Sequence, residues 1–171
     1  GFKKKQPCIL IFGGSLGAKR INDVVFKSID KLKDFNIIHI VGKNNTKNIE
    51  KPNYYQIEFA SNIADYFALA DLVVSRAGAN SIFEILALKK PMLLIPLGKT
   101  QSRGDQIENA EAFKRYGYAS ILYEEELTPV TLYKSIANLN RNKERYIKRM
   151  QEVSSVPSNK LVLQKILDLS K

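Results

Sequence analysis

A glycine-rich stretch follows the first apolar run of the chain and has the residue types that hold an anion. It reads Gly13-Gly14-Ser15-Leu16-Gly17, and an amphipathic segment starts directly after it. Glycine lets the backbone come close to a ligand, and the free N–H groups at a helix start carry partial positive charge. Ser15 adds a hydroxyl group to these donors. The composition favours a phosphate or pyrophosphate, although a tight strand–helix turn would need the same glycines for its dihedral angles alone.

The spacing of these glycines differs from that of a nicotinamide dinucleotide site. Such sites combine Gly-x-Gly-x-x-Gly with an acidic residue after the second strand, where it binds a ribose. Here the second apolar run ends in Val41-Gly42-Lys43, without a carboxylate. The sequence therefore argues against a nicotinamide cofactor, and we expect the chain to need no cofactor.

A second stretch ends a β-branched run with Arg76 and the small residues Ala77, Gly78 and Ala79. It is followed by Asn80, Ser81 and Glu84. Small side chains allow a ligand to come close to a helix start. Asn80 and Ser81 are also common helix caps. The carboxylate of Glu84 could interact favourably with the positive end of the helix dipole. It could also turn toward the loop and accept hydrogen bonds from both hydroxyl groups of a ribose. The spacing alone leaves both interpretations of Glu84 open.

A third polar segment runs from Pro96 to a helix that is predicted to begin near Asp105. Asp105, Gln106 and Asn109 lie in the first turns of that helix, at positions i, i+1 and i+4. Carboxylate and amide side chains in such a place are typical readers of sugar hydroxyl groups, because amides donate and accept while carboxylates accept. Capping of the helix by Asp105 would explain part of the pattern.

The remaining residues offer neither a complete catalytic set nor a metal site. The single histidine, His39, lies between Ile38 and Ile40 in an apolar run, which is typical of a structural residue. No Ser/His/Asp, Cys/His or metal-ligand spacing occurs in the sequence. A complete catalytic centre is therefore not visible in the sequence, and no metal site is expected.

Short apolar runs alternate with longer amphipathic segments along the chain, which predicts alternating strands and helices. The strands are predicted at Cys8–Phe12, Asn36–Val41, Tyr54–Glu58, Leu72–Ser75, Met92–Pro96 and Ala119–Leu122. The helices are predicted at Ala18–Leu32, Asn62–Ala70, Ala79–Leu88, Asp105–Tyr116, Pro129–Leu139, Lys143–Val153 and Ser158–Leu169. This order predicts an α/β fold with a Rossmann-like, doubly wound and mainly parallel sheet of about six strands. Ligands bind beyond the carboxyl ends of such strands, which is where the three polar loops are expected.

The size and composition suit one globular domain. The chain has 171 residues, of which 44% are hydrophobic and 26% are charged, the balance of an ordinary globular protein. No apolar run approaches the ~20 residues of a membrane span. The single cysteine, Cys8, excludes a disulfide framework and favours a reducing, cytoplasmic setting.

The formal net charge of +10 is compatible with an anionic partner. The basic residues are scattered, apart from Lys3-Lys4-Lys5 and the stretch from Arg141 to Arg149, and aromatic residues are not interleaved with them. A single-stranded nucleic acid would need such interleaving for base stacking. We therefore expect a solvated basic face and no nucleic acid, while contact with an anionic membrane surface stays open.

Three motifs together resemble the carboxyl-terminal half of the MurG family, in order and in spacing. They are GGSLGAKRIN (Gly13–Asn22), SRAGANSIFEILALKKPMLLIPL (Ser75–Leu97) and SRGDQIENAEAF (Ser102–Phe113). The likeness extends from about Cys8 to Leu122. Members of this family transfer GlcNAc from UDP-GlcNAc to lipid I, which yields lipid II for peptidoglycan synthesis. The resemblance implies one half of a GT-B glycosyltransferase, in which two Rossmann-like domains enclose a cleft and the carboxyl-terminal one holds the nucleotide sugar.

The resemblance implies a role for each loop in binding the nucleotide. Ser15 and the backbone of Gly13 and Gly14 would lie near the diphosphate. The helix start would contact the phosphates through Ala79, Asn80 and Ser81. Asn80 stands where some relatives have Leu or Thr, so its contact would come from the backbone. Glu84 would bind the ribose hydroxyl groups, and the backbone of Phe59 and Ala60 would meet the uracil edge.

The same resemblance implies that Asp105, Gln106 and Asn109 read the hydroxyl groups of GlcNAc. Many relatives carry Gln-Gln where this chain has Asp105-Gln106, so the contact of Asp105 is the least secure of the set. No catalytic residue is expected in this chain, because the general base of the family is proposed to lie in the amino-terminal domain.

The resemblance also implies a division of the chain. Residues 1–7 would be a remnant of the inter-domain linker, residues 8–156 the UDP-GlcNAc-binding domain, and residues 157–171 a carboxyl-terminal helix directed toward the amino-terminal domain. In the family that other domain holds lipid I and the membrane-docking patch. The intact enzyme would be peripheral on the inner face of the bacterial cell membrane, and this chain alone would bind the donor without turnover.

Three other functions are compatible with parts of the sequence. One is the donor-binding subunit of a split GlcNAc transferase acting on dolichol-linked GlcNAc. Another is a UDP-GlcNAc epimerase domain, which would need additional acid and base side chains near the cleft. The third is a basic module, without enzymatic activity, that binds nucleic acid or a membrane.

Overall fold

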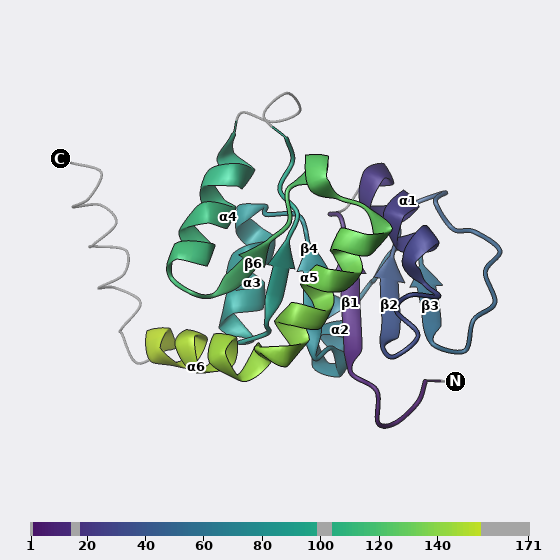
Figure 1. Ribbon diagram of the computed structural model, residues 1–171, viewed down its shortest axis with the longest axis horizontal. Helices are drawn as coiled ribbons and strands as arrows, with labels where there is room; N and C mark the ends of the chain where they lie inside the picture. Colours follow the sequence, from purple (N-terminus) through teal and green to yellow (C-terminus); the bar gives the residue numbers. More distant parts are fainter. Residues whose placement is uncertain (1, 15–17, 99–103, 155–171) are drawn as a thin grey trace.

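The computed structural model describes residues 2–14, 18–98 and 104–154 (Figure 1). Among the predicted features, Ser15 and the helix at Ser158–Leu169 lie outside these residues. Six parallel strands form one sheet in the order β3-β2-β1-β4-β5-β6. Their bounds are β1 Cys8–Phe12, β2 Asn36–Ile40, β3 Tyr54–Ile57, β4 Leu72–Ser75, β5 Met92–Leu94 and β6 Ala119–Ile121.

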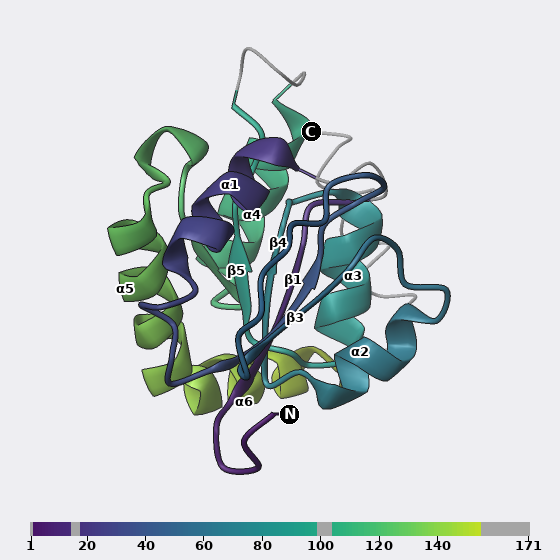
Figure 2. The ribbon, with the colours of Figure 1, turned by 90° about the vertical axis from the view of Figure 1, so that its right-hand side faces the viewer.

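Helices cover both faces of this sheet, as the alternating pattern predicts. Figure 2 shows the sheet edge-on, with α1 and α5 on one side and α2 and α3 on the other. The helices are α1 Lys19–Ser28, α2 Ile63–Leu69, α3 Ala79–Ala87, α4 Asp105–Arg115, α5 Pro129–Arg141 and α6 Lys143–Ser154. Helix α6 passes along the end of the sheet where the strands begin (Figure 1). The predicted doubly wound α/β fold is therefore confirmed.

Strand β1 shows why the core forms around an uninterrupted apolar run. All five of its residues are buried, because helices cover both faces of a parallel sheet. Ile9 and Ile11 pack in the cluster that includes α1 and α5, whereas Leu10 and Phe12 pack in the cluster of α2, α3 and α4. Burial of one such side chain stabilises the fold by about 1.5–3 kcal/mol. The central strand therefore holds the two helix layers together.

The element boundaries differ from the predictions mainly in the first helix. Helix α1 ends at Ser28 rather than Leu32, and the following residues form a turn in which the Leu32 N–H still donates to the Ser28 carbonyl at 2.9 Å. Ile29 and Leu32 are nevertheless buried in the core. A short 3-10 helix, η1 (Glu124–Glu126), follows β6 and was not expected from the sequence.

The single histidine belongs to a buried polar chain that joins three elements. His39 of β2 is fully buried, with its Nε2 3.0 Å from Asn22 Oδ1 and its Nδ1 2.9 Å from the Tyr54 hydroxyl. The Asn22 amide group donates to the Val41 carbonyl at 2.8 Å. Asn22 Oδ1 therefore accepts from His39 Nε2–H, and Tyr54 donates to Nδ1. This arrangement requires a neutral ring and confirms the structural role predicted for His39.

Burial lowers the pKa of His39 from 6.5 to about 3, because the charged ring would lose its hydration. The unfolded chain therefore binds a proton more readily than the folded chain between these values, and the free energy of unfolding should fall as the pH falls below 6.5. We expect a loss of about 2 kcal/mol between pH 7 and pH 5 from this group alone. Urea denaturation at the two pH values measures it.

The matched control is His39→Gln, which keeps a donor and an acceptor but does not titrate. Carboxylates contribute equally to both proteins, so the difference between their pH dependences isolates His39. An equal loss of stability in the wild type and in His39→Gln would contradict the neutral, buried ring.

Candidate functional site

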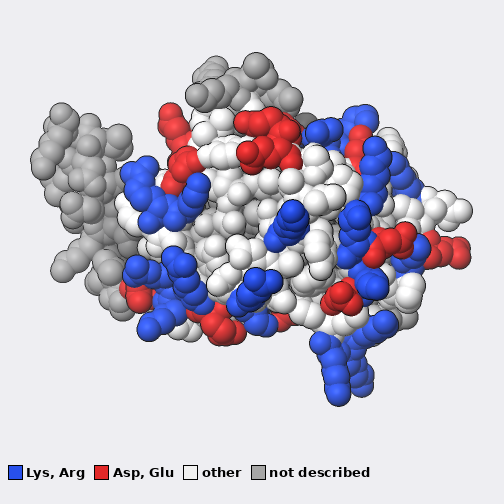
Figure 3. All heavy atoms as spheres, in the orientation of Figure 1, with Lys and Arg blue, Asp and Glu red and all other residues white. Residues whose placement is uncertain are grey.

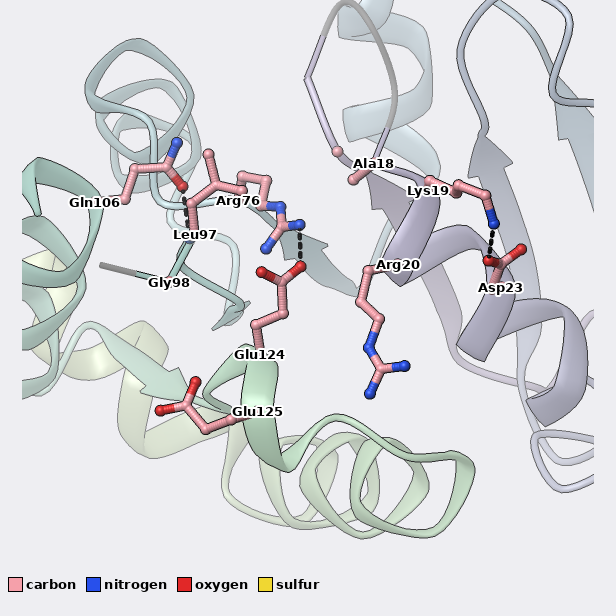
Figure 4. Close-up of a pocket in the computed structure, with 11 residues that line it drawn as sticks. Ala18, Lys19, Arg20, Asp23, Arg76, Leu97, Gly98, Gln106, Glu124 and Glu125 are labelled. Carbon is pink, nitrogen blue, oxygen red and sulfur yellow. Dashed lines mark hydrogen bonds and ion pairs between the residues drawn. The ribbon is translucent and has the colours of Figure 1, made fainter. Parts of the chain in front are cut away.

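An open cleft of about 730 Å³ lies at the carboxyl ends of the strands. Strand β1 pairs with β2 on one side and with β4 on the other, and the helices that follow β1 and β4 cover opposite faces of the sheet. The chain therefore diverges between β1 and β4, and ligands of doubly wound folds bind at such a divergence. Figure 4 shows the residues of α1, the β5–α4 loop and η1 that surround the cleft.

The glycine turn after β1 forms one wall of this cleft. A Cβ atom on Gly13 would lie 2.2 Å from the Ala18 Cβ and 2.7 Å from the Ala18 nitrogen, so only glycine fits there. Gly14 has a φ of 98°, a left-handed conformation that favours glycine. Among the described residues no side chain caps the start of α1, and its first N–H groups have no partner within the helix. Ser15, predicted to join them, lies outside the described residues.

The start of α3 offers a second set of backbone donors. The N-cap is Gly78, and no side chain caps the helix; the alternative that Asn80 and Ser81 act as caps is therefore wrong. The first intrahelical bond runs from the Ile82 N–H to the Gly78 carbonyl at 3.1 Å. The preceding N–H groups of Ala79, Asn80 and Ser81 thus have no partner within the helix and carry its positive dipole end.

Glu84 is an exposed residue of α3. Within the residues that the structure describes, its carboxylate has no hydrogen-bond or ion-pair partner. A carboxylate in this state can accept hydrogen bonds from a ligand without breaking an internal contact. Its geometry is compatible with both interpretations from the sequence, the dipole and the ribose.

Backbone groups of two loops hold the amide side chains at the start of α4. Gln106 Oε1 accepts from the Leu97 N–H at 3.1 Å, so its amide group is left as a donor. Asn109 donates to the Ala77 carbonyl at 3.1 Å, so its Oδ1 is left as an acceptor. Asp105 is exposed, and the N-cap is Gly104 without a capping side chain, so Asp105 is not the cap. Within the part of the chain that the structure describes, the NH2 group of Gln106 is therefore left as a donor and Oδ1 of Asn109 as an acceptor.

Phe59 and Ala60 lie beyond the carboxyl end of β3, at the edge of the sheet. Strand β3 is two positions from β1, or about 10 Å along the edge. Phe59 is 70% exposed. Of the residues predicted from the sequence, Gly13 and Gln106 line the cleft itself, whereas Phe59 and Ala60 lie to one side of it.

Sequence reasoning missed a buried ion pair in the floor of the cleft. Arg76 Nη2 lies 2.5 Å from Glu124 Oε1, and both residues are at most 9% exposed. Arg76 Nη1 also donates to the carbonyls of Ile95 and Pro96, at 3.1 and 3.3 Å. Figure 4 shows the two side chains directed toward each other between the β5–α4 loop and η1. A single arginine at the end of a strand gives no sequence signal for such a partner, because Glu124 is distant in the chain.

A second hollow of about 420 Å³ continues the cleft past Leu97 and Gly98. Tyr123 forms part of its wall and donates a hydrogen bond to Glu111. This bond raises the pKa of Tyr123 to about 12, because the carboxylate disfavours a second negative charge. The phenol is therefore a protonated wall residue and not a base.

The distribution of surface charge does not indicate one particular kind of binding partner. On the face in Figure 3, Lys and Arg are spread among Asp and Glu rather than gathered in one stripe. Among the described residues, no three His, Cys, Asp or Glu side chains form a group that could hold a metal. Within the same residues, no helix has the length and apolar character needed to cross a membrane.

Comparisons with known proteins place this geometry in a family. The model of the glycosyltransferase family 28 C-terminal domain matches residues 8–165. A Clostridium botulinum protein is 52% identical over 97% of this chain and 48% of its own length. A Bacillus cereus protein is 46% identical over the same shares. Both are named UDP-N-acetylglucosamine--N-acetylmuramyl-(pentapeptide) pyrophosphoryl-undecaprenol N-acetylglucosamine transferase, the second with the number 2. The chain therefore spans about half the length of the curated relatives it matches.

Solved structures agree with the predicted architecture. The crystal structure of Acinetobacter baumannii MurG has a TM-score of 0.74 and 27% identity, covering 87% of this chain and 46% of that chain. The glycosyltransferase SnogD from Streptomyces nogalater has a TM-score of 0.67 and 16% identity, and the match covers 99% of this chain and 45% of that chain. At this low identity the likeness shows the fold alone. The resemblance to the MurG family and the half GT-B fold are confirmed.

The close contact at Gly13 leads to a stability prediction. We expect Gly13→Ala to lower the free energy of unfolding by about 1–3 kcal/mol, because the new methyl group would overlap Ala18. Gly78→Ala is the matched control, since a Cβ there meets nothing within 4 Å, and we expect it to change stability by less than about 1 kcal/mol. Denaturant unfolding compares them. Equal effects of the two substitutions would contradict the tight β1–α1 turn.

Proposed function

The chain belongs to the family of C-terminal domains of glycosyltransferase family 28. We therefore propose that it is the donor-binding domain of a GlcNAc transferase. It binds UDP-GlcNAc, and the intact enzyme transfers GlcNAc to lipid I to form lipid II. The names of the curated relatives support this reaction. The observation that carries the proposal is the pair of uncapped helix starts, α1 and α3, at the divergence of β1 and β4.

In this proposal the diphosphate lies against the glycine turn and the two helix starts. Gly13 and Gly14 allow close backbone approach, and Ser15 adds a hydroxyl donor. The N–H groups at the start of α3, which follows β4, face the negative charge of the diphosphate. As the bond from the sugar to the diphosphate breaks, charge grows on the leaving UDP and these fixed donors stabilise it. Backbone dipoles of this kind stabilise the charge without a metal.

The nucleoside is held by groups on either side of the diphosphate. Glu84 accepts hydrogen bonds from the two ribose hydroxyl groups, and a charged acceptor makes such bonds stronger than neutral ones. The backbone of Phe59 and Ala60 meets the uracil edge. The exposed state of Glu84 supports this assignment, because its carboxylate would lose no internal partner on binding.

The sugar is read by the start of α4. The free amide group of Gln106 donates to a GlcNAc oxygen, and the free Oδ1 of Asn109 accepts from a hydroxyl group. Asp105 adds a carboxylate acceptor at the exposed rim. A donor and an acceptor fixed by backbone contacts discriminate hydroxyl positions, because a misplaced hydroxyl leaves a polar group unpaired.

The remaining parts of the reaction belong to the amino-terminal domain of the intact enzyme. That domain supplies the lipid I site, the general base and the contact with the anionic inner face of the cell membrane. The acceptor hydroxyl attacks the anomeric carbon from the side opposite to UDP, which inverts the configuration. Holding the two substrates between two domains supplies much of the rate.

The ribose assignment leads to a binding experiment. We expect Glu84→Ala to weaken UDP-GlcNAc binding by about 1–3 kcal/mol, the range for a lost hydrogen bond to a charged group. Calorimetric titration with UDP-GlcNAc and with UDP should give the same loss, because both contain the ribose. Glu144→Ala, an exposed carboxylate on α6, is the control and should bind like the wild type. Unchanged binding by Glu84→Ala would contradict the ribose role.

The proposal that this chain binds the donor while the other domain holds the acceptor site and the base leads to a second experiment. We expect the isolated chain to bind UDP-GlcNAc and to transfer no GlcNAc to a lipid I analogue, because the acceptor site and the base lie elsewhere. Transfer from labelled UDP-GlcNAc measures the activity. Appreciable transfer by the isolated chain would refute the proposed division between the two domains.

A further inference from the structure

Arg76 directly follows β4 and lies in the floor of the cleft, where its side chain contacts protein groups. Its side chain is buried, and both terminal nitrogens are engaged with protein groups: Nη2 with Glu124, Nη1 with the carbonyls of Ile95 and Pro96. Both terminal nitrogens of this guanidinium group are thus used in contacts within the protein, and only part of its five N–H groups remains for a ligand. The role of Arg76 therefore follows from the protein groups that its side chain binds.

These partners connect Arg76 to the start of α4 by two routes. The carbonyls that it binds belong to the two residues that follow β5, and the next N–H, that of Leu97, is the one that binds Gln106 Oε1 at 3.1 Å. The residue after Arg76 is Ala77, whose carbonyl binds the Asn109 amide at 3.1 Å. Gln106 and Asn109 are thus oriented by the two chain segments that Arg76 joins.

Glu124 fixes the position of Arg76 from a third segment. It belongs to η1, which follows β6, so one guanidinium group joins the ends of β4, β5 and β6. Complete loss of either side chain would leave the other buried without a partner, which would strongly destabilise the fold. The planar guanidinium can donate to the carboxylate and to the carbonyls at the same time, whereas a lysine ammonium at this depth cannot reproduce that fork.

We propose that Arg76, held by Glu124, is a positioning residue for sugar recognition. It sets the loop carbonyls so that Gln106 presents its amide donor and Asn109 its oxygen acceptor to the sugar. This inference rests on the proposed function. The nucleotide is held by other groups, the glycine turn, the helix starts and Glu84, none of which hydrogen-bonds to the Arg76 side chain in the described residues. Arg76 therefore governs the preference for UDP-GlcNAc over UDP, and not the affinity for UDP.

The test compares the affinities of the chain for UDP-GlcNAc and for UDP by calorimetry. In Arg76→Lys we expect the ratio of the two affinities to fall about tenfold, the effect of one or two misplaced hydrogen bonds. The affinity for UDP should change less than about twofold, because its hydrogen bonds are unaltered. Circular dichroism and denaturant unfolding establish that the variant is folded. A merely structural defect would weaken both ligands together and leave the ratio unchanged.

Two further variants complete the test. Glu124→Gln keeps an acceptor for the guanidinium but removes the charge, so it should fold and lower the same ratio by a smaller factor than Arg76→Lys. It also serves as the reporter if Arg76→Lys does not fold. Arg145→Lys is the matched control, since Arg145 is exposed on α6, which passes along the end of the sheet opposite to the cleft (Figure 1). We expect it to keep the wild-type ratio.

The outcomes separate this inference from the proposed function. A wild-type chain that binds neither ligand contradicts the proposed function itself. A wild type that binds both ligands equally overturns the inference, because there is then no sugar recognition to position. A wild-type ratio in folded Arg76→Lys or Glu124→Gln, or equal losses for both ligands, also overturns it.

Discussion

The parallel pairing of a fully buried central strand is the constraint on which the site depends. Strand β1 is covered on both faces and pairs with β2 and β4 in the same direction, so every neighbouring strand ends at the same edge of the sheet. The helices after β1 and β4 must then leave that edge on opposite faces. Two helix starts at the carboxyl ends of neighbouring strands therefore follow from the topology, before any polar side chain is considered.

Polar groups around this cleft fall into two kinds. Those expected to meet the ligand are backbone donors and side chains with unused hydrogen-bonding capacity, such as Glu84 and the free ends of Gln106 and Asn109. Those that hold the wall are buried and paired, as Arg76 and Glu124 are. The Asn22–His39–Tyr54 chain plays a similar part between α1 and the strands β2 and β3. Satisfied buried groups give rigidity, and rigid walls reduce the entropy lost when a ligand binds.

Much of the fold could be predicted from the sequence, because continuous apolar runs and amphipathic segments alternate along the whole chain. The differences between the predicted and the observed structure are confined to short segments. Helix α1 ends early, at Ser28, although Ile29 and Leu32 continue its apolar spacing into a turn. In the site, the loops could be placed by their glycines and polar residues, but the contacts within the loops could not. The Arg76–Glu124 pair joins residues 48 positions apart, and only the sheet order β4-β5-β6 brings them together.

We propose above that the carboxyl ends of the strands bind a nucleotide sugar. The most direct measurement is a titration of the isotopically labelled chain with UDP-GlcNAc, followed by backbone amide chemical shifts. We expect saturable shifts at Gly13 and Gly14, at the start of α3 and at the start of α4, with little change along α6 at the opposite end of the sheet. Saturable shifts confined to α6, or no shifts at millimolar UDP-GlcNAc, would contradict the claim.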